Sequence, residues 1–453
     1  MGAGSGRLAG AAFRGVLLLG VLAMLLVAWP GQLTYDSVSQ LAEGAANVQK
    51  TFGPAMYAWL LGASHHIGGG TGAYLAFSAL VLLAALWSLP QLRPRTSWLA
   101  VVLAVAVVLS PAVMVYQGIV WKDVMFANFA VAGFVALAHV GGQARRPWRW
   151  LAFALAVLCL AMACLVRQNG LIAAVLAALT LGVMLRGLAL ARAAGSAIAT
   201  LIAIVFLSQI LDAAVQPPQA DSARRTDIGL RVLLHYDILG AVAHDPTLAL
   251  GEIDKVRPQT DDLIRARAAS AYSPERVDTL QSQPDLAKSF WKIPAPALKA
   301  QWRRIVTGHT GAYLAHRLDA FRWVFLTPDI DRCLPVAAGV EGDPAQLKEL
   351  GLVAGQDARD LALVRYARAF THTPAYSHAA YAALALTLLI FLLIRGDAAD
   401  LAIAGLLGAA LATAASYFAI SIACDYRYLY ILDLAALVGL LYVALDPRLR
   451  RTF

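Results

Sequence analysis

Long apolar runs separated by short, arginine-rich stretches are the feature of this sequence that most restricts its fold. A helix that crosses a bilayer needs ~20 predominantly apolar residues, and about ten windows of the chain suit that length. The sequence therefore predicts an all-α polytopic membrane protein, in which the first run is an uncleaved span rather than a signal peptide. We expect spans at 12–30, 71–91, 96–115, 121–140, 150–166, 170–187, 195–214, 375–394, 399–420 and 427–445.

The composition agrees with a membrane protein and argues against a soluble one. Hydrophobic residues make up 60% of the chain and charged residues only 14%, whereas roughly 45–50% of a soluble domain is apolar. The formal net charge is +9, but much of the excess lies in short loops between apolar runs, and no nucleic-acid-binding motif accompanies it. We therefore expect no nucleic-acid partner.

Arginines mark one side of the predicted bundle. They precede the first span or follow an even-numbered one, so an even count of crossings brings all of them to the same side, which the positive-inside rule makes the cytoplasm. Both termini are then cytoplasmic, and the Ala-, Leu- and Arg-rich composition indicates a bacterial inner membrane. These arginines are Arg7, Arg14, Arg93, Arg95, Arg145, Arg146, Arg149, Arg186, Arg192, Arg395, Arg448, Arg450 and Arg451.

This topology divides the chain into three parts. Residues 1–215 form an N-terminal transmembrane module with a first outer loop at 31–53 and a short apolar stretch at 54–68, which suits a re-entrant or interfacial helix better than a span. Residues 216–374 mix apolar, aromatic and charged residues in helical spacing, which predicts an extracytoplasmic helical domain. Residues 375–453 form a C-terminal transmembrane module.

Asp36 is the first candidate for chemistry, because it follows the first span on the outer side. It could be only local: Ser37 with Gln40 fits a capping box that opens a short helix, and Asp36 would favour the positive end of that helix. Alternatively, Asp36 is a carboxylate at the mouth of a membrane cavity, where it acts as a general base or a metal ligand.

Three further candidates lie at outer ends of predicted spans. Lys122 and Asp123 begin a span directly after Trp121; they are either interfacial anchors or a phosphate-binding cation and a second carboxylate facing Asp36. Arg167 ends the fifth span on the side that the positive-inside bias leaves poor in cations. A guanidinium at that level could hold an anionic headgroup bidentately.

The last candidates lie near the return of the chain to the membrane. Arg427 and Tyr428 open the final span, as part of an aromatic belt or as a binding pair. Arg317 lies on a helical pattern, where it could reach a phosphate or belong to a solvated face. Cys333 and Cys424 would both lie outside, where a disulfide could form, but their spacing alone does not establish one.

Several other chemistries lack their motifs. His65 and His66 are not accompanied by a ligand set with zinc-site spacing. The chain has no phosphate-binding glycine loop, no HExxH, no GxSxG and no cysteine-based redox motif. Energy for any reaction would therefore have to come with the substrate.

Taken together, these motifs resemble those of the polytopic type-C (GT-C) glycosyltransferases. An acid, here Asp36, lies shortly after the first span. Further along, the segment Phe52 to Leu60 contains Gly53-Pro54 followed by a short helical stretch rich in aromatic residues. The family often has His-Pro-Pro-Leu-Tyr at this point, and Gly53 stands where its His would be. Asp123 is similar to the second acidic position, and Arg427-Tyr428 to a closing Arg-Tyr near the last span.

The resemblance implies transfer of a sugar from a polyprenyl-phosphate carrier to a cell-envelope glycan or lipid acceptor, with inversion at the anomeric carbon. Asp36 would be the base, with a divalent metal, Mg or Mn, as an option beside it, and Asp123 the second carboxylate. The candidates for binding the donor and its phosphate are Lys122, Arg167, Arg317, Arg427 and Tyr428.

Three other classes remain open at the level of sequence. A lipid or solute transporter, or a flippase, would also have many spans, but such proteins often show two related halves with charges at mid-depth. A ligase or acyltransferase that moves a preassembled glycan or acyl group would share an outer-face site. A structural subunit of an envelope-assembly complex would need none of these charges.

Overall fold

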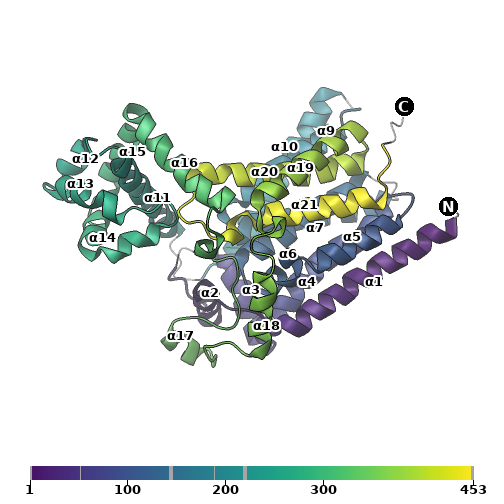
Figure 1. The fold of residues 1–453 in the computed structure, drawn as a ribbon. Helices are drawn as coiled ribbons and strands as arrows, with labels where there is room; N and C mark the ends of the chain where they lie inside the picture. Colours follow the sequence, from purple (N-terminus) through teal and green to yellow (C-terminus); the bar gives the residue numbers. More distant parts are fainter. Residues whose placement is uncertain (1–2, 52, 142–145, 188, 218–221, 450–453) are drawn as a thin grey trace. The chain divides into compact units, whose positions relative to one another are not determined.

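The structure, a computed structural model, describes residues 3–51, 53–141, 146–187, 189–217 and 222–449. Its regular elements are helices, and β pairing within these ranges is limited to isolated bridges. The prediction of an all-α polytopic membrane protein is confirmed (Figure 1).

The chain forms two compact units. Unit 1 comprises Met1–Ala220, Val336–Thr413 and Leu429–Phe453, and unit 2 comprises Asp221–Pro335 and Ala414–Tyr428. The helices of unit 1 are α1 (Ala3–Ala28), α2 (Tyr35–Ala46), α3 (Ala55–His66), α4 (Gly70–Ser88), α5 (Trp98–Val108), α6 (Pro111–Met114), α7 (Lys122–Gly141), α8 (Arg146–Val166), α9 (Leu171–Met184), α10 (Leu190–Val215), α17 (Pro344–Glu349), α18 (Ala358–Arg368), α19 (His378–Arg395), most of α20 (Ala398–Ile420) and α21 (Tyr430–Leu445). Those of unit 2 are α11 (Ser222–His244), α12 (Gly251–Asp254), α13 (Thr260–Ala271), α14 (Pro284–Trp291), α15 (Ala295–Gly308), α16 (Thr310–Leu326) and the end of α20.

The apolar helices coincide with the predicted spans. Within the described residues, 8 helices are long and apolar enough to cross a membrane, and α5 with the short helices after it adds a pair bent by 58°. The shorter apolar helix that includes α9 accounts for the remaining prediction. The bend falls at Ser110–Pro111, where Ser110 is extended (φ −72°, ψ 150°), because a proline disfavours the helical conformation in the residue before it.

Between the first two spans lie two short helices. The apolar stretch expected at 54–68 forms α3, whose 12 residues reach ~18 Å and are too few to cross a bilayer core. α3 packs tightly on α2 through glycines: a Cβ on Gly44 would lie 1.9 Å from the carbonyl oxygen of Ala58. Phe52, which opens the motif before α3, lies outside the described residues.

The expected outer domain at 216–374 is divided between the two units. Its residues 221–335 belong to unit 2, whereas residues 216–220 and the stretch from Val336 onward belong to unit 1. The physical reason is backbone pairing: Leu33 donates to Gly339 and accepts from Glu341, both at 2.9 Å. These bonds tie the second half of the segment to the first outer loop.

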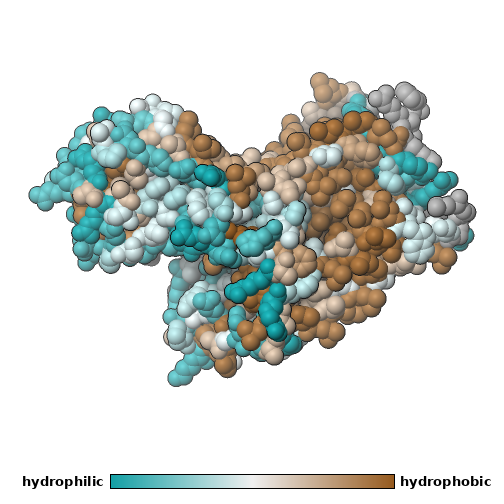
Figure 2. Space-filling model, in the orientation of Figure 1, coloured by the Kyte–Doolittle hydropathy of each residue, from teal (hydrophilic) through white to brown (hydrophobic). Residues whose placement is uncertain are grey.

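Unit 2 has a hydrophobic core of its own. Side chains from its helices meet in one buried cluster, which includes Leu234, Ile238, Ile264, Phe290 and Ile305. In Figure 2 the surface over α12 to α15 is largely hydrophilic, as expected for a water-exposed segment.

The surface of the unit 1 bundle is apolar instead. Figure 2 shows a broad hydrophobic face over its helices, and exposed side chains such as Leu19 (68%), Leu26 (75%) and Phe206 (65%) have the character of lipid-facing residues. The chain is therefore a multi-pass membrane protein.

Arginines from distant parts of the sequence gather at one end of unit 1, which we call the basic end. The start of α1 and the end of α21 lie at this end of the bundle (Figure 1). Together with the stretch before α5, they line one cavity. The arginines in its lining are Arg7, Arg14, Arg93, Arg95 and Arg448.

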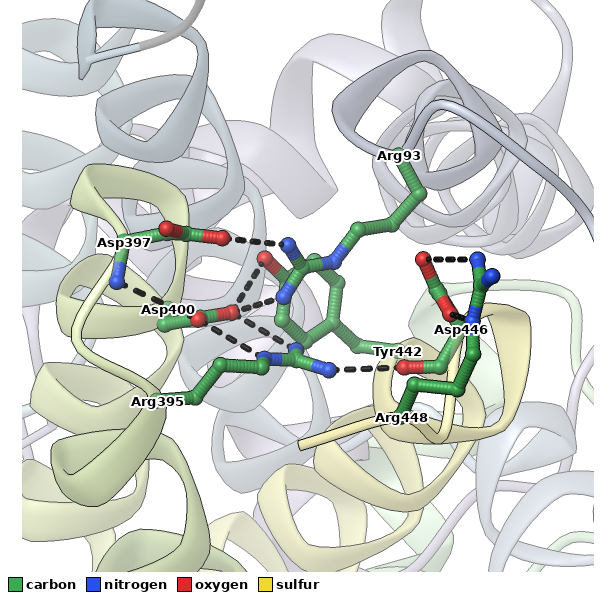
Figure 3. A network of polar contacts seen from close by, with 7 residues as sticks. All are labelled: Arg93, Arg395, Asp397, Asp400, Tyr442, Asp446 and Arg448. Carbon is green, nitrogen blue, oxygen red and sulfur yellow. Dashed lines mark hydrogen bonds and ion pairs between the residues drawn. The ribbon is translucent and has the colours of Figure 1, made fainter. Parts of the chain in front are cut away.

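The loop after α19 joins the same end. Arg395 and Arg93 both bind Asp400 (Figure 3). A Cβ on Gly396 would lie 3.6 Å from Nη2 of Arg186. This clustering agrees with the arrangement that the positive-inside rule predicts. Arg145, Arg450 and Arg451 lie outside the described residues.

Candidate functional site

Three segments far apart in sequence meet at the other end of unit 1, which we call the outer end. α1 leads to it from the basic end with 26 residues, a length of ~39 Å. The chain after α1 then pairs with the turn before α7, because Gln32 donates to Gly118 at 2.9 Å and accepts from Val120 at 2.9 Å. With the bonds from Leu33 to the 339–341 stretch, these pairs fix the first outer loop on both sides.

Asp36 lies in the first turn of α2, and its side chain is exposed. The helix begins three residues earlier than the predicted Ser37–Gln40 capping pair implies, so that prediction is wrong. Thr34 is the N-cap and Ser37 the N3 residue of the capping box. Asp36 is therefore not the cap, although a carboxylate here is favoured by the helix dipole.

Two side-chain bonds join the start of α2 to the start of α7. The Trp121 indole donates to Thr34 Oγ1 at 3.0 Å, and the Ser37 hydroxyl donates to the Val120 carbonyl at 2.5 Å. Lys122, the first residue of α7, is half-buried and follows directly. The structure thus brings together the two segments that carry Asp36 and Lys122.

Asp123 and Arg167 form a buried ion pair. Asp123 is 1% exposed and Arg167 8%, and the Arg167 guanidinium lies 6.0 Å from the centre of the Phe126 ring. Arg167 is the residue directly after α8, so the pair fixes the start of α7 to the end of α8. The predicted second carboxylate and one predicted phosphate-binding cation therefore contact each other.

A buried polar network lies behind these segments, and the sequence analysis did not single it out. The amide of Gln117 donates to Asn128 Oδ1 and to the Tyr430 hydroxyl, both at 2.8 Å, and Asn128 donates to Ser78 Oγ at 3.0 Å. The Tyr430 hydroxyl in turn donates to the Ala112 carbonyl at 2.7 Å. Polar residues inside apolar runs were the only available signal for this network.

Aromatic rings and a second buried pair extend the network. Tyr116 stacks on Tyr430 with ring centres 5.1 Å apart and lies 5.7 Å from Trp121. His378 Nδ1 lies 2.9 Å from Asp433 Oδ1, and both side chains are at most 1% exposed. These contacts hold α19 and α21 against the turn that leads into α7.

Arg317, predicted to reach a phosphate, is part of the interior of unit 2. Its side chain is fully buried, forms an ion pair with Asp237, and donates to the Ser421 carbonyl at 2.8 Å. Asp237 also accepts from the Trp302 indole at 2.7 Å and lies 3.1 Å from His316 Nε2. Burial lowers the pKa of His316, and its contact with Asp237 opposes that shift. The cluster joins α11, α15 and α16.

Arg427 and Tyr428 also belong to unit 2. Arg427 lies 3.1 Å from Asp425 and 5.8 Å from the Tyr428 ring centre, and Tyr428 stacks on Tyr417 at 5.5 Å.

Cys333 and Cys424 are joined in a disulfide. Disulfides persist in oxidising compartments, so the bond agrees with the predicted extracytoplasmic position of both residues.

A cavity of about 330 Å³ lies beside the paired loops of the outer end. Its lining combines the chain after α1, including Trp29 and Gln32, with the 353–360 stretch, which contributes Asp357 and Arg359. For metals, the described part of the chain contains no group of three or more His, Cys, Asp or Glu side chains placed to hold an ion.

Comparisons with known proteins identify no family. No family model matches the sequence, and no curated protein matches it. Among solved structures, the chain is similar to the archaeal oligosaccharyltransferase AglB from Archaeoglobus fulgidus, in complex with an inhibitory peptide and a dolichol-phosphate. The TM-score is 0.40 and the identity 12%, over 95% of this chain and 50% of the other. This chain spans about half the length of that enzyme, and a likeness at this TM-score carries no argument about function.

Proposed function

We propose that this protein is a membrane glycosyltransferase that moves a sugar from a polyprenyl-phosphate carrier to a cell-envelope glycan or lipid. The carrying observation is that an exposed carboxylate, Asp36, lies on an element joined by hydrogen bonds to the segment bearing Lys122. Both lie at the end of an apolar bundle, where a lipid-linked donor and a water-soluble acceptor can meet. The resemblance of the sequence motifs to those of GT-C enzymes supports the same reaction.

In the proposed reaction, Asp36 is the general base. The acceptor oxygen bonds to the anomeric carbon while its proton passes to the Asp36 carboxylate. The bond between the anomeric carbon and the phosphate oxygen breaks, and its electron pair stays on the polyprenyl phosphate. A single displacement of this kind inverts the anomeric centre.

The leaving phosphate gains charge and requires a fixed cation. We assign this role to Lys122, which is only half-buried at the first turn of α7. The Asp123–Arg167 pair acts as a positioning element, because it holds the start of α7 through two mutually compensated charges. Donor binding by Arg427 and Tyr428 stays a prediction from the sequence, and the buried Arg317 serves the interior of unit 2.

The proposed reaction includes no step through a metal. Mg²⁺ prefers oxygen ligands in octahedral geometry, and Asp36 belongs to no ready ligand cluster among the described residues. A divalent ion beside Asp36 would therefore take most of its ligands from substrate and water. The bacterial inner membrane, with both termini cytoplasmic, is the location we assign.

A donor-consumption assay in nanodiscs tests the proposal. The protein is incubated with radiolabelled polyprenyl-phosphate sugars and membrane extract, with Mg²⁺, with Mn²⁺ or with EDTA. Asp36→Asn should lower the transfer rate by about 10²–10⁴-fold, because the amide cannot accept the proton. Glu349→Gln, which alters an exposed acid on α17, is the matched control and should keep the wild-type rate.

Two outcomes would contradict the proposal. If no donor in the panel is consumed, solute and lipid transport in proteoliposomes becomes the first alternative. If Asp36→Asn transfers as fast as Glu349→Gln, Asp36 serves only the helix terminus. Consumption of a preassembled glycan in place of single sugars would indicate a ligase.

A further inference from the structure

The cavity at the basic end gathers five arginines that the proposed reaction does not use. It has a volume of about 790 Å³ and lies between the first turns of α1, the 90–98 stretch and the residues after α21. Asp446 is the one acidic residue in its lining, against the five arginines of the basic end.

The positive charges of two of these arginines are compensated by carboxylates of the protein. Arg93 pairs with Asp397 and Asp400 (Figure 3) and is one of the residues that line the cavity. Arg448 contacts both carboxylate oxygens of Asp446, at 2.7 and 3.0 Å. These pairs fix the shape of the cavity without neutralising its remaining charges.

The positive charges of three other arginines are not balanced by an acidic side chain among the described residues. Arg14 donates to the Trp87 carbonyl at 3.1 Å and lies 5.7 Å from the Trp87 ring centre, so its partners are neutral. Arg7 and Arg95 are exposed, and within the described ranges neither forms an ion pair. The cavity therefore offers about three uncompensated guanidinium groups, a natural match for a phosphate.

The surroundings of the cavity are those of a lipid rather than of a free anion. Both flanking helices, α1 and α5, expose apolar side chains next to it: Leu8 is 66% exposed, Trp98 49%, Leu99 47% and Val102 65%. Tryptophan is enriched at the level of headgroups. A ligand with an anionic head and apolar tails would satisfy both the arginines and these flanks.

We propose that this cavity binds the phosphate headgroup of an anionic phospholipid of the cytoplasmic leaflet, with Arg7, Arg14 and Arg95 contacting the phosphate. Basic pockets between transmembrane helices on the cytoplasmic side suit such headgroups. The site lies ~39 Å from the outer end, the length of α1. It is therefore separate from the donor site proposed above and does not depend on that function.

Lipid retention tests the proposal. The detergent-purified protein is titrated with phosphatidylglycerol or with phosphatidylcholine of the same acyl chains, and bound lipid is counted by native mass spectrometry. Wild type should retain the anionic lipid preferentially. Arg7→Gln with Arg95→Gln should weaken its binding by about fivefold for each arginine removed, because each guanidinium contributes one favourable charge.

Arg192→Gln is the matched control, since Arg192 is exposed at the start of α10 and lies outside the cavity lining. It should bind phosphatidylglycerol as wild type does. Equal binding by the double variant and Arg192→Gln, or equal retention of the two lipids, would overturn the proposal. Full displacement of the lipid by millimolar glycerol phosphate would also overturn it, because the site would then take a free phosphate without the tails.

Discussion

The two ends of unit 1 both carry arginines and aspartates, but they use them differently. At the basic end, Asp400 is fully buried and contacts Arg93, Arg395 and the Tyr442 hydroxyl, the last at 2.9 Å. At the outer end, one pair is buried, while Asp36 is exposed. Buried charges that compensate one another clamp helices together, whereas an exposed carboxylate remains accessible to solvent. This contrast makes Asp36 rather than Asp123 our candidate base.

The largest expected effect concerns the side of the membrane that each end faces. Val353→Cys lies beside the outer end with 84% of the native side chain exposed, and Leu190→Cys lies at the start of α10 with 86% exposed. In intact cells, a membrane-impermeant maleimide should label the first variant and not the second, and cell lysis should expose both. The unsubstituted chain gives the background, and labelling of only Leu190→Cys would reverse the topology.

Loss of a carboxylate should lower the free energy of unfolding more at the basic end than at the outer end. Asp400→Asn leaves two buried guanidinium groups without their shared counter-ion, so we expect the free energy of unfolding to fall by about 3–5 kcal/mol. Asp397→Asn is the control, because its side chain is 40% exposed and pairs with Arg93; we expect about 0–1 kcal/mol. Denaturant titration in mixed micelles measures both, and similar losses would show that burial does not set the difference.

Loss of one member of the outer pair should have a somewhat smaller effect. Arg167→Met removes the ion-pair partner of the buried Asp123 and should lower the free energy of unfolding by about 3 kcal/mol, whereas Asp123→Leu with Arg167→Met should recover most of that loss. The same micelle titration applies, followed by the transfer assay on the double variant. If the refolded double variant has no activity at all, Asp123 does more than position α7.

The smallest expected effect is on stability at Asp36. Asp36→Ala should lower the free energy of unfolding by only about 0.5 kcal/mol, from the helix dipole. Asp343→Ala should lower it by about 1 kcal/mol, because Asp343 caps α17 by accepting from Ala345 and Gln346. A larger loss at Asp36 than at Asp343 would indicate that Asp36 has mainly a structural role.

The sequence located the candidate residues better than their partners. Asp36, Lys122, Asp123 and Arg167 were all singled out from their position next to apolar runs, and the structure places Asp123 against Arg167. Nothing in the spacing indicated that Arg317 would be fully buried, because an arginine on a helical pattern has the same local signal on a solvated face as in a core.

The network around Gln117, Asn128 and Tyr430 shows the same limit. Each residue could be recognised as a polar group inside an apolar stretch, yet their bonds connect the turn before α7 with helices α4, α7 and α21. The requirement that a buried polar group find a partner is general, but which partner it finds depends on how the helices pack.

The sequence by itself determined where the apolar helices lie along the chain and how the arginines are segregated. Both follow from local properties of the sequence: the length of each apolar run compared with the bilayer thickness, and the number of arginines in the loops between the runs. Only the tertiary structure decided that the stretch after Val336 joins the first outer loop, that Asp400 serves two arginines, and that Asp36 stays exposed while Asp123 is buried. These outcomes depend on contacts between residues tens to hundreds of positions apart, which no local pattern encodes.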